Sequence, residues 1–295
     1  MYLIGGIMAR FKDSLQAFTD TNTSMITRQF TILSRQPEAS RRTIHVDATE
    51  KEIEQLTNDG YIVRPRLIPP ELLARLRTAA DELEAEQLPQ AKVSDASFGG
   101  LFIRDLIDRH KTFQGLMEFS PLVSVARAML GPQVQVHASV LRVSYPDKPE
   151  QAVEWHFHQR VVPEPKPPLF RRPEVIDNLI YLDELTPESG PLVVLPKSHL
   201  RDEAIPMGDH TDKPGQVMVT CPAGSVVTST AALWHRAMAS TPAGGKRRLV
   251  IIGFSPTWIK QVDRPSAGTG RGLTDLLVPG ASAEMRELLG LEGYF

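Results

Sequence analysis

Between residues 134 and 254 the chain contains a succession of short apolar segments, each ended by a turn signal with proline or glycine. Several segments alternate apolar and polar residues, as strands with one buried face do. Frequent short strands joined by turns favour a sandwich or barrel over a fold of alternating strands and helices. We expect strands at 61–63, 134–143, 152–159, 175–182, 192–195, 216–220, 225–229 and 248–254.

Helical patterns lie mainly before and after this region. Thr49 and Glu52 have the spacing of a capping box, which predicts a helix over residues 50–58. Pro70 suits the first turn of a second helix, in which leucine and alanine recur at helical spacing. We expect further helices over 101–130 and 283–291. The predicted fold class is therefore mainly β with flanking helices (α+β).

Residues 1–45 show no sustained period, and we interpret them as a loosely ordered arm with one short helix near 8–18. Residues 46–295 are expected to form one domain that contains the helical N-terminal part, the strands and a C-terminal tail. The chain has 295 residues, which is enough to bury a sizeable core.

The overall composition indicates which partners and compartments to expect. The net charge of −2 does not favour a surface that binds nucleic acid or membrane. No segment has the length of a transmembrane helix, and the apolar N-terminus lacks the features of a signal peptide. Cys221 is the only cysteine, which excludes an internal disulfide and fits a reducing compartment. We therefore expect a cytoplasmic protein in which Cys221 is a buried apolar residue.

Three histidines are the candidate metal ligands. His156 and His158 are two residues apart on an expected strand, so their side chains should point to the same face. His235 follows a later strand, and neutral imidazole is the commonest metal ligand near neutral pH. Because the chain has 8 histidines, a His-x-His pair also arises by chance. Trp155 and Trp234, each next to a candidate ligand, should point the other way and pack in the core.

Four stretches share their pattern with one enzyme family. They are 58–63 with 67–72, 136–139 leading to 155–158, 189–199, and 223–235 followed by an arginine before an apolar strand. The third stretch, Ser-Gly-Pro-Leu-Val-Val-Leu-Pro-Lys-Ser-His, is the most specific. Together they make the chain resemble the phytanoyl-CoA dioxygenase family over about residues 55–258. The resemblance implies a double-stranded β-helix (jelly roll) and an oxygenase that uses Fe(II) and 2-oxoglutarate as cosubstrate.

The sequence departs from the family at one ligand. The usual set is two histidines and one carboxylate, whereas the alignment through Trp155 and His156 puts His158 where the aspartate belongs. A second alignment makes His158 the first ligand and leaves Arg160 in the carboxylate position. We prefer the first, because a fixed cation there would repel a metal ion. Glu164, six residues after His158, is a further candidate acid for the metal site.

The resemblance also indicates residues for the cosubstrate. Either Arg247 or Arg248 matches the arginine that holds the distal carboxylate of 2-oxoglutarate, and a guanidinium binds a carboxylate bidentately. We prefer Arg247 for its distance from His235. Alternatively, both are solvated cations at the end of a strand. Ser139, Asn178 and Tyr181 lie on neighbouring strands and are candidate hydrogen-bond donors to 2-oxoglutarate or substrate, or else ordinary strand residues.

The resemblance thus implies a dioxygenase that hydroxylates a small organic molecule with O2. One alternative is a cupin-type metal dioxygenase or isomerase that does not use 2-oxoglutarate, since His-x-His also occurs in cupins. The spacing from the turn at 222–224 to His235 is longer than the cupin pattern. Another alternative is a degenerate family member that binds a ligand without turnover. The proline-rich segment 163–173 is expected to form a lid or rim beside the site.

Overall fold

The structure is a computed structural model, and it describes residues 26–32, 40–90, 100–146, 151–158, 167–169, 174–201, 203–263 and 265–292. The strands are β1 (Ile26–Ile32), β2 (Ser40–Val46), β3 (Tyr61–Arg64), β4 (Leu101–Arg104), β5 (Val134–Ser144), β6 (Val153–His156), β7 (Ile176–Tyr181), β8 (Leu192–Val194), β9 (Val217–Val219), β10 (Val226–Thr230), β11 (His235–Ala237) and β12 (Arg247–Pro256). The α-helices are α2 (Glu50–Asp59), α3 (Pro70–Gln87), α4 (Leu106–Arg109), α5 (Lys111–Gln114), α6 (Ser120–Leu130) and α7 (Ala283–Leu288).

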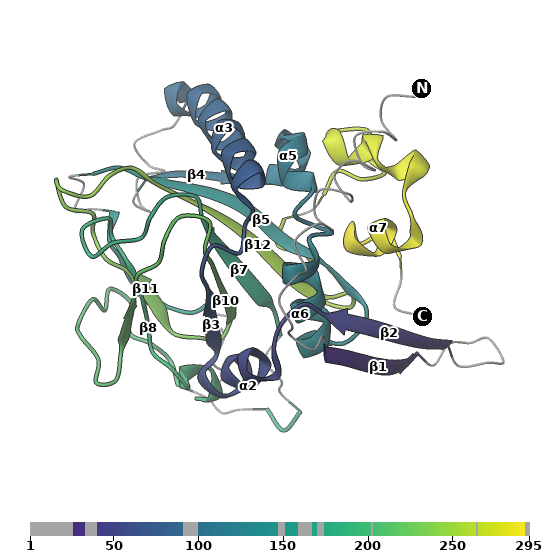
Figure 1. Ribbon diagram of the computed structural model, residues 1–295, viewed down its shortest axis with the longest axis horizontal. Coiled ribbons are helices and arrows are strands. Elements are labelled where there is room, and N and C mark those ends of the chain that lie inside the picture. The colour runs from purple at the N-terminus through teal and green to yellow at the C-terminus, as the bar shows by residue number, and fades with distance from the viewer. Residues whose placement is uncertain are drawn as a thin grey trace.

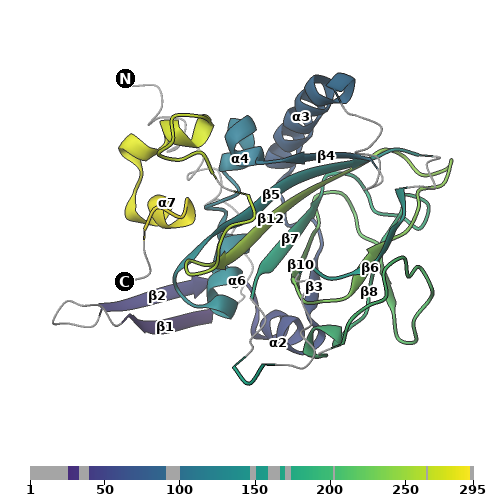
Figure 2. The same cartoon turned by 180° about the vertical axis from the view of Figure 1, so that it is seen from behind.

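Two antiparallel sheets form the centre of the molecule. The larger has six strands in the order β3-β10-β7-β12-β5-β4, and the smaller has four in the order β6-β11-β8-β9. In Figures 1 and 2 the smaller sheet lies on one side of the larger sheet, and helices α3 and α6 lie on the other. This arrangement is the double-stranded β-helix, as predicted, with helices added on one side.

The period of two in the strands divides the large sheet into two faces with different roles. On β12, Val250 and Ile252 belong to the main hydrophobic core, which includes Leu76 of α3 and Leu122 of α6. The alternate residues of β12 point toward the smaller sheet. Each strand of the large sheet therefore supplies one row of side chains to the helical core and one row to the space between the sheets.

The N-terminal prediction needs a correction. β1 and β2 form an antiparallel hairpin with Ile26 opposite Val46, so 1–45 is not a loose arm throughout. Ile26, Ile44 and Val46 share a hydrophobic cluster with Val125 of α6, and Figure 1 shows the hairpin beside that helix. The other side chains of these strands are mostly polar, so only a single apolar row marks them. The short helix predicted near 8–18 lies outside the described residues.

The predicted helix over 101–130 is also wrong in its first part. Leu101 and Ile103 are buried on strand β4, which pairs with β5. Asp105 then adopts a positive φ of 59°, and two single-turn helices precede α6. By contrast, Thr49 and Glu52 form the predicted capping box. Cys221 is buried in an apolar cluster, also as predicted.

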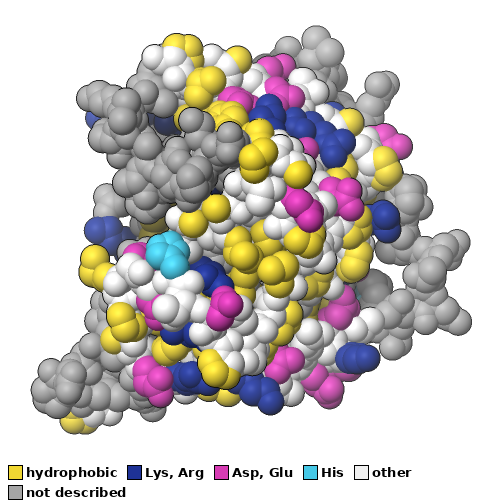
Figure 3. All heavy atoms as spheres, turned by 90° about the vertical axis from the view of Figure 1, so that its left-hand side faces the viewer, with side chains coloured by type: hydrophobic (Ala, Val, Ile, Leu, Met, Phe, Trp, Pro, Cys, Tyr) yellow, Lys and Arg dark blue, Asp and Glu magenta, His cyan; other side chains and the backbone are white. Residues whose placement is uncertain are grey.

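The surface carries both signs of charge. Figure 3 shows the side of the molecule that bears β8 and β11, where hydrophobic side chains gather near the middle and charged side chains lie mainly around them. This mixture agrees with the near-neutral net charge. Among the described residues, we find no helix with both the length and the apolar character needed to cross a membrane.

Candidate active site

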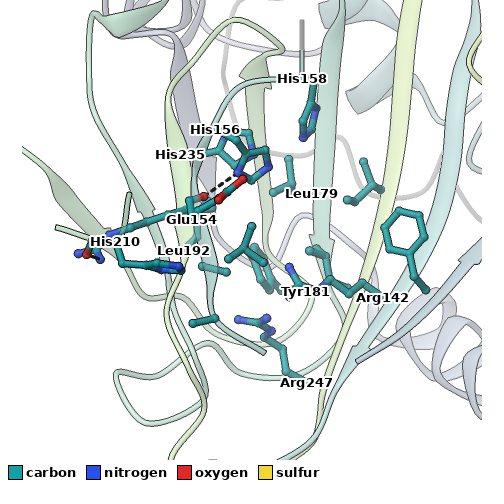
Figure 4. A pocket seen from close by; sticks show the side chains of 17 residues that line it. Arg142, Glu154, His156, His158, Leu179, Tyr181, Leu192, His210, His235 and Arg247 are labelled. Atoms are coloured by element: carbon teal, nitrogen blue, oxygen red, sulfur yellow. Dashed lines mark hydrogen bonds between the residues drawn. The ribbon is translucent and has the colours of Figure 1, made fainter. Parts of the chain in front are cut away.

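A cavity of about 420 Å³ lies between the two sheets. Figure 4 shows three histidines, His156, His158 and His235, at one end of it, whereas Arg247 lies at the other end. Apolar side chains of the large sheet line the cavity between these ends, including Leu179, Leu249 and Ile251. Arginine, histidine and glutamate side chains make up nearly half of the lining, and an apolar wall combined with convergent polar groups is typical of a small-molecule site.

Strand pairing brings the three histidines together. His235 of β11 lies directly opposite His156 of β6, and their ring centroids are 4.2 Å apart. His158 follows β6, and its ring centroid is 4.8 Å from that of His235. One ligand atom of each residue lies within 4.8 Å of the others. Trp155 and Trp234 are buried in a separate hydrophobic cluster, as predicted for residues that alternate with these histidines.

The hydrogen bonds of His156 and His235 identify their tautomers. Nδ1 of His156 lies 2.9 Å from the carbonyl oxygen of Glu154, and Nδ1 of His235 lies 2.9 Å from that of Leu233. Because a carbonyl oxygen can only accept, Nδ1 must carry the proton in both rings. The lone pair is then on Nε2, the atom that ligates a metal in this tautomer. These rings are therefore suited to a divalent metal ion.

His158 has a different hydrogen-bond partner. Its Nδ1 lies 2.7 Å from Oδ2 of Asp177, a buried residue of β7. Burial alone would raise the pKa of Asp177, but its contact with His158 and the nearby imidazoles of His137 and His235 outweigh burial and lower that pKa below its usual value. Sequence reasoning missed Asp177. The sequence indicated its position only through strand alternation, which places Asp177 on the same face of β7 as Leu179 and Tyr181 of the cavity wall.

Arg247 and Arg248 lie on opposite faces of β12, as alternation requires. Arg247 lines the cavity, is 3% exposed, and donates from Nη2 to the hydroxyl of Ser144 at 3.0 Å. Arg248 lies on the helical face, where its guanidinium contacts Asp183 at 2.6 Å and Asp81 at 2.8 Å. Arg248 is therefore part of an ion-pair network, and Arg247 is the one of the two that lines the cavity.

Arg142 is a second cavity cation, which sequence reasoning also missed. It lies on β5 and donates from Nη2 to the carbonyl oxygen of Gln151 at 3.1 Å. Burial lowers the pKa of Arg142 to about 10, so the guanidinium stays protonated at neutral pH. Among the described residues no carboxylate forms an ion pair with Arg142 or Arg247, and the Nε of each has no hydrogen-bond partner there. Two buried cations whose counter-charges are not among the described residues indicate a site for an anion.

Tyr181 lines the same part of the cavity. Burial raises the pKa of its phenol despite the nearby charge of Arg247, so the hydroxyl keeps its proton and can donate a hydrogen bond. Asn178 is on the opposite face of β7, where its side chain bonds Thr228 and the carbonyl oxygen of Ile252. Ser139 shares its strand face with Leu141 and Val143 of the helical core. Neither Asn178 nor Ser139 lines the cavity.

The structure does not describe every predicted site residue. Arg160 and Glu164 lie outside the described residues, as does most of the proline-rich segment 163–173.

Comparison with known proteins assigns the chain to a family. The sequence profile of the family described as phytanoyl-CoA dioxygenase (PhyH) matches residues 56–248, more than half of the chain. L-proline trans-4-hydroxylase of Streptomyces griseoviridis is 24% identical over 140 residues, which cover 48% of this chain and 51% of that protein. The match therefore spans about half the length of this curated relative.

Solved structures share the fold. HygX from Streptomyces hygroscopicus, with nickel and 2-oxoglutarate bound, has a TM-score of 0.60 at 16% identity and covers 76% of this chain and 94% of its own. EctD from S. alaskensis, in its apo form, has a TM-score of 0.59 at 21% identity and covers 82% of this chain and 90% of its own. Together with the match of the family profile, these findings lead to one conclusion: the chain belongs to the phytanoyl-CoA dioxygenase family.

Proposed function

We propose that this protein is an Fe(II)- and 2-oxoglutarate-dependent dioxygenase that hydroxylates a small organic molecule. The observation that carries the proposal is the pairing, within one cavity, of a three-histidine cluster with two buried guanidinium groups at the opposite side. The first can hold a metal ion and the second an anionic group. Family membership and the fold shared with HygX, a protein solved with nickel and 2-oxoglutarate, support the same reading.

In this proposal His156, His158 and His235 hold the iron through Nε2. The hydrogen bonds at Nδ1 hold each ring in one tautomer and one orientation before metal arrives, which lowers the cost of binding. Bound iron would supply the activation of O2, coupled to oxidative decarboxylation of 2-oxoglutarate. Three neutral imidazoles leave the positive charge of the ion uncompensated by its direct protein ligands.

Arg247 and Arg142 are proposed to bind the distal carboxylate of 2-oxoglutarate, with Tyr181 as a hydrogen-bond donor. This carboxylate would give both guanidinium groups the counter-charge that the described residues do not provide. Their interaction with it takes place out of water, where charge-assisted hydrogen bonds are strong. The same groups would discriminate against a 2-oxo acid that lacks a second carboxylate.

The remaining space is proposed to receive the substrate. Apolar side chains, among them Leu179, Leu192 and Ile251, surround this space and exclude water from the reacting atoms. The cavity of about 420 Å³ has to hold 2-oxoglutarate and substrate together, which favours a small molecule. We propose a cytoplasmic location because the single cysteine fits a reducing compartment.

The proposal is tested by measuring 2-oxoglutarate turnover in the purified protein with Fe(II) and O2. Members of this reaction class produce succinate and CO2, and many do so slowly without their substrate, so succinate formation that requires both Fe(II) and O2 is the expected result. A panel of amino acids and other small molecules then identifies compounds that accelerate it.

Two other functions predict different results. A cupin-type enzyme would bind Fe(II) without binding 2-oxoglutarate, a reading that family membership does not favour. A degenerate member would bind 2-oxoglutarate and form no succinate with any compound of the panel. Either result would contradict the proposed dioxygenase.

A further inference from the structure

Asp177 is a buried carboxylate in contact with the histidine cluster. Its side chain is 5% exposed, and Oδ2 is 2.7 Å from Nδ1 of His158. His156 and His235 instead donate to carbonyl oxygens two residues before them in the chain. Of these three hydrogen bonds between described residues, the one made by His158 has a carboxylate as its acceptor. In the preferred alignment, His158 is also the residue at the position of the family's carboxylate ligand.

The surroundings of Asp177 are arranged for a charged group that faces His158. Among the described residues, no lysine or arginine forms an ion pair with Asp177. A Cβ at position 253 would lie 2.7 Å from Oδ1 of Asp177, so Gly253 of β12 provides the space that the carboxylate occupies. With His158 in the neutral form that ligates a metal, this buried carboxylate has no cationic partner among the described residues, which is costly. A metal ion beyond His158 would supply the missing positive charge.

We propose that Asp177 takes over the role of the carboxylate ligand that His158 replaces. It would act from outside the ligand set, through its hydrogen bond to the imidazole of His158. A carboxylate that accepts the Nδ1 proton fixes the ring orientation and makes Nε2 a stronger donor. It also places one negative charge close to an otherwise neutral ligand set. Asp177 is thus a positioning residue that acts through His158. This inference rests on the proposed function, because it assumes the three-histidine metal site.

The first test is the metal affinity of Asp177→Asn, which removes the charge and keeps the size. Apo-protein is titrated anaerobically with Fe(II), and with Co(II) as a spectroscopic probe, in the absence of 2-oxoglutarate. We expect 10- to 100-fold weaker binding, about the range for loss of such a partner. We also expect an altered Co(II) absorption spectrum. Asp183→Asn is the matched control, since it removes one carboxylate from the helical face and should leave metal affinity within twofold.

A charge-swap cycle separates this role from simple structural support. His158→Asp alone puts a second carboxylate beside the buried carboxylate of Asp177, so it should bind metal poorly. Adding Asp177→Asn to that variant removes the repulsion and restores the usual ligand set of the family. We expect the double variant to bind Co(II) at least tenfold more tightly than His158→Asp alone. The same Asp177→Asn change would then weaken metal binding when residue 158 is histidine and strengthen it when residue 158 is aspartate.

The outcomes distinguish this inference from the proposed function. If the wild-type protein binds neither Fe(II) nor Co(II), the proposed function and this inference both fail. If the wild-type protein binds metal and Asp177→Asn binds it within twofold, the proposed function stands and only the role of Asp177 is refuted. The same role is refuted if Asp177→Asn weakens binding equally in both backgrounds, because a purely structural residue would behave in that way.

Discussion

Arg247 and Arg248 are adjacent on β12, and replacing each with methionine should have opposite effects. Arg247 is buried, donates one side-chain hydrogen bond to Ser144, and has no carboxylate partner among the described residues. Removing an uncompensated buried charge relieves a desolvation cost of several kcal/mol. The lost hydrogen bond and the hydroxyl left without its donor offset much of this gain, by about 1–3 kcal/mol. We therefore expect Arg247→Met to stabilise the apo-protein by about 1 kcal/mol, or about 2 °C in Tm.

Arg248→Met should instead destabilise the protein. Arg248 contacts both oxygens of Asp183 at 2.6 and 2.9 Å, and it also contacts Asp81. Without Arg248, the remaining ion pair of Asp183 among the described residues is the longer one with Arg77, whose Nε lies 3.9 Å from the carboxylate. Hydrogen bonds to charged groups contribute about 1.5–3 kcal/mol, so a loss of about 2 kcal/mol and a decrease of about 4 °C in Tm are expected. Scanning calorimetry of the two apo variants measures both effects.

The affinity for 2-oxoglutarate should instead fall in the more stable variant, Arg247→Met, and stay nearly unchanged in the less stable one, Arg248→Met. Loss of a buried charge partner costs about 3 kcal/mol, or roughly 100-fold in Kd, so Arg247→Met should bind 2-oxoglutarate about 100-fold more weakly. Arg248→Met should bind it within twofold of the wild type. Anaerobic calorimetric titration of the Fe(II)-loaded proteins gives these constants. Equal weakening in both variants, or a larger effect at Arg248, would refute the assignment of the two strand faces.

Two further predictions concern residues that the sequence did not single out. Arg142→Gln should weaken 2-oxoglutarate binding by about tenfold or more, since one of two guanidinium groups is lost; unchanged affinity in the same titration would exclude Arg142 from the anion site. Gly253→Ala should lower both Co(II) affinity and Tm, because the new Cβ would lie 2.7 Å from Asp177. Gly245→Ala, which meets nothing within 4 Å, is its control and should change neither quantity.

The parts of the site that were predictable from sequence have local or short-period signals. His156 and His158 are two residues apart, so strand alternation alone places them on one face. The same alternation separates Arg247 from Arg248. The jelly-roll fold followed from many short strands together with family motifs. These signals need no knowledge of which strands are neighbours.

Asp177 and Arg142 were missed because their roles depend on strand order. They lie on β7 and β5, which are both neighbours of β12 in the large sheet. No spacing in the chain indicates that Asp177 contacts His158, or that Arg142 and Arg247 line the same cavity. Likewise, Leu101 began an apparent helical pattern, and only its pairing with Val143 of β5 makes it part of a strand.

The most direct test of the whole account is an anaerobic titration of apo-protein with Fe(II) and then 2-oxoglutarate, followed by visible absorption. Chelation of Fe(II) by 2-oxoglutarate gives a metal-to-ligand charge-transfer band, which requires the metal site and the anion site at once. We expect this band in the wild-type protein and in Arg160→Ala, and its loss in His158→Ala. A band that survives in His158→Ala and disappears in Arg160→Ala, or no band in the wild type, would contradict the three-histidine site.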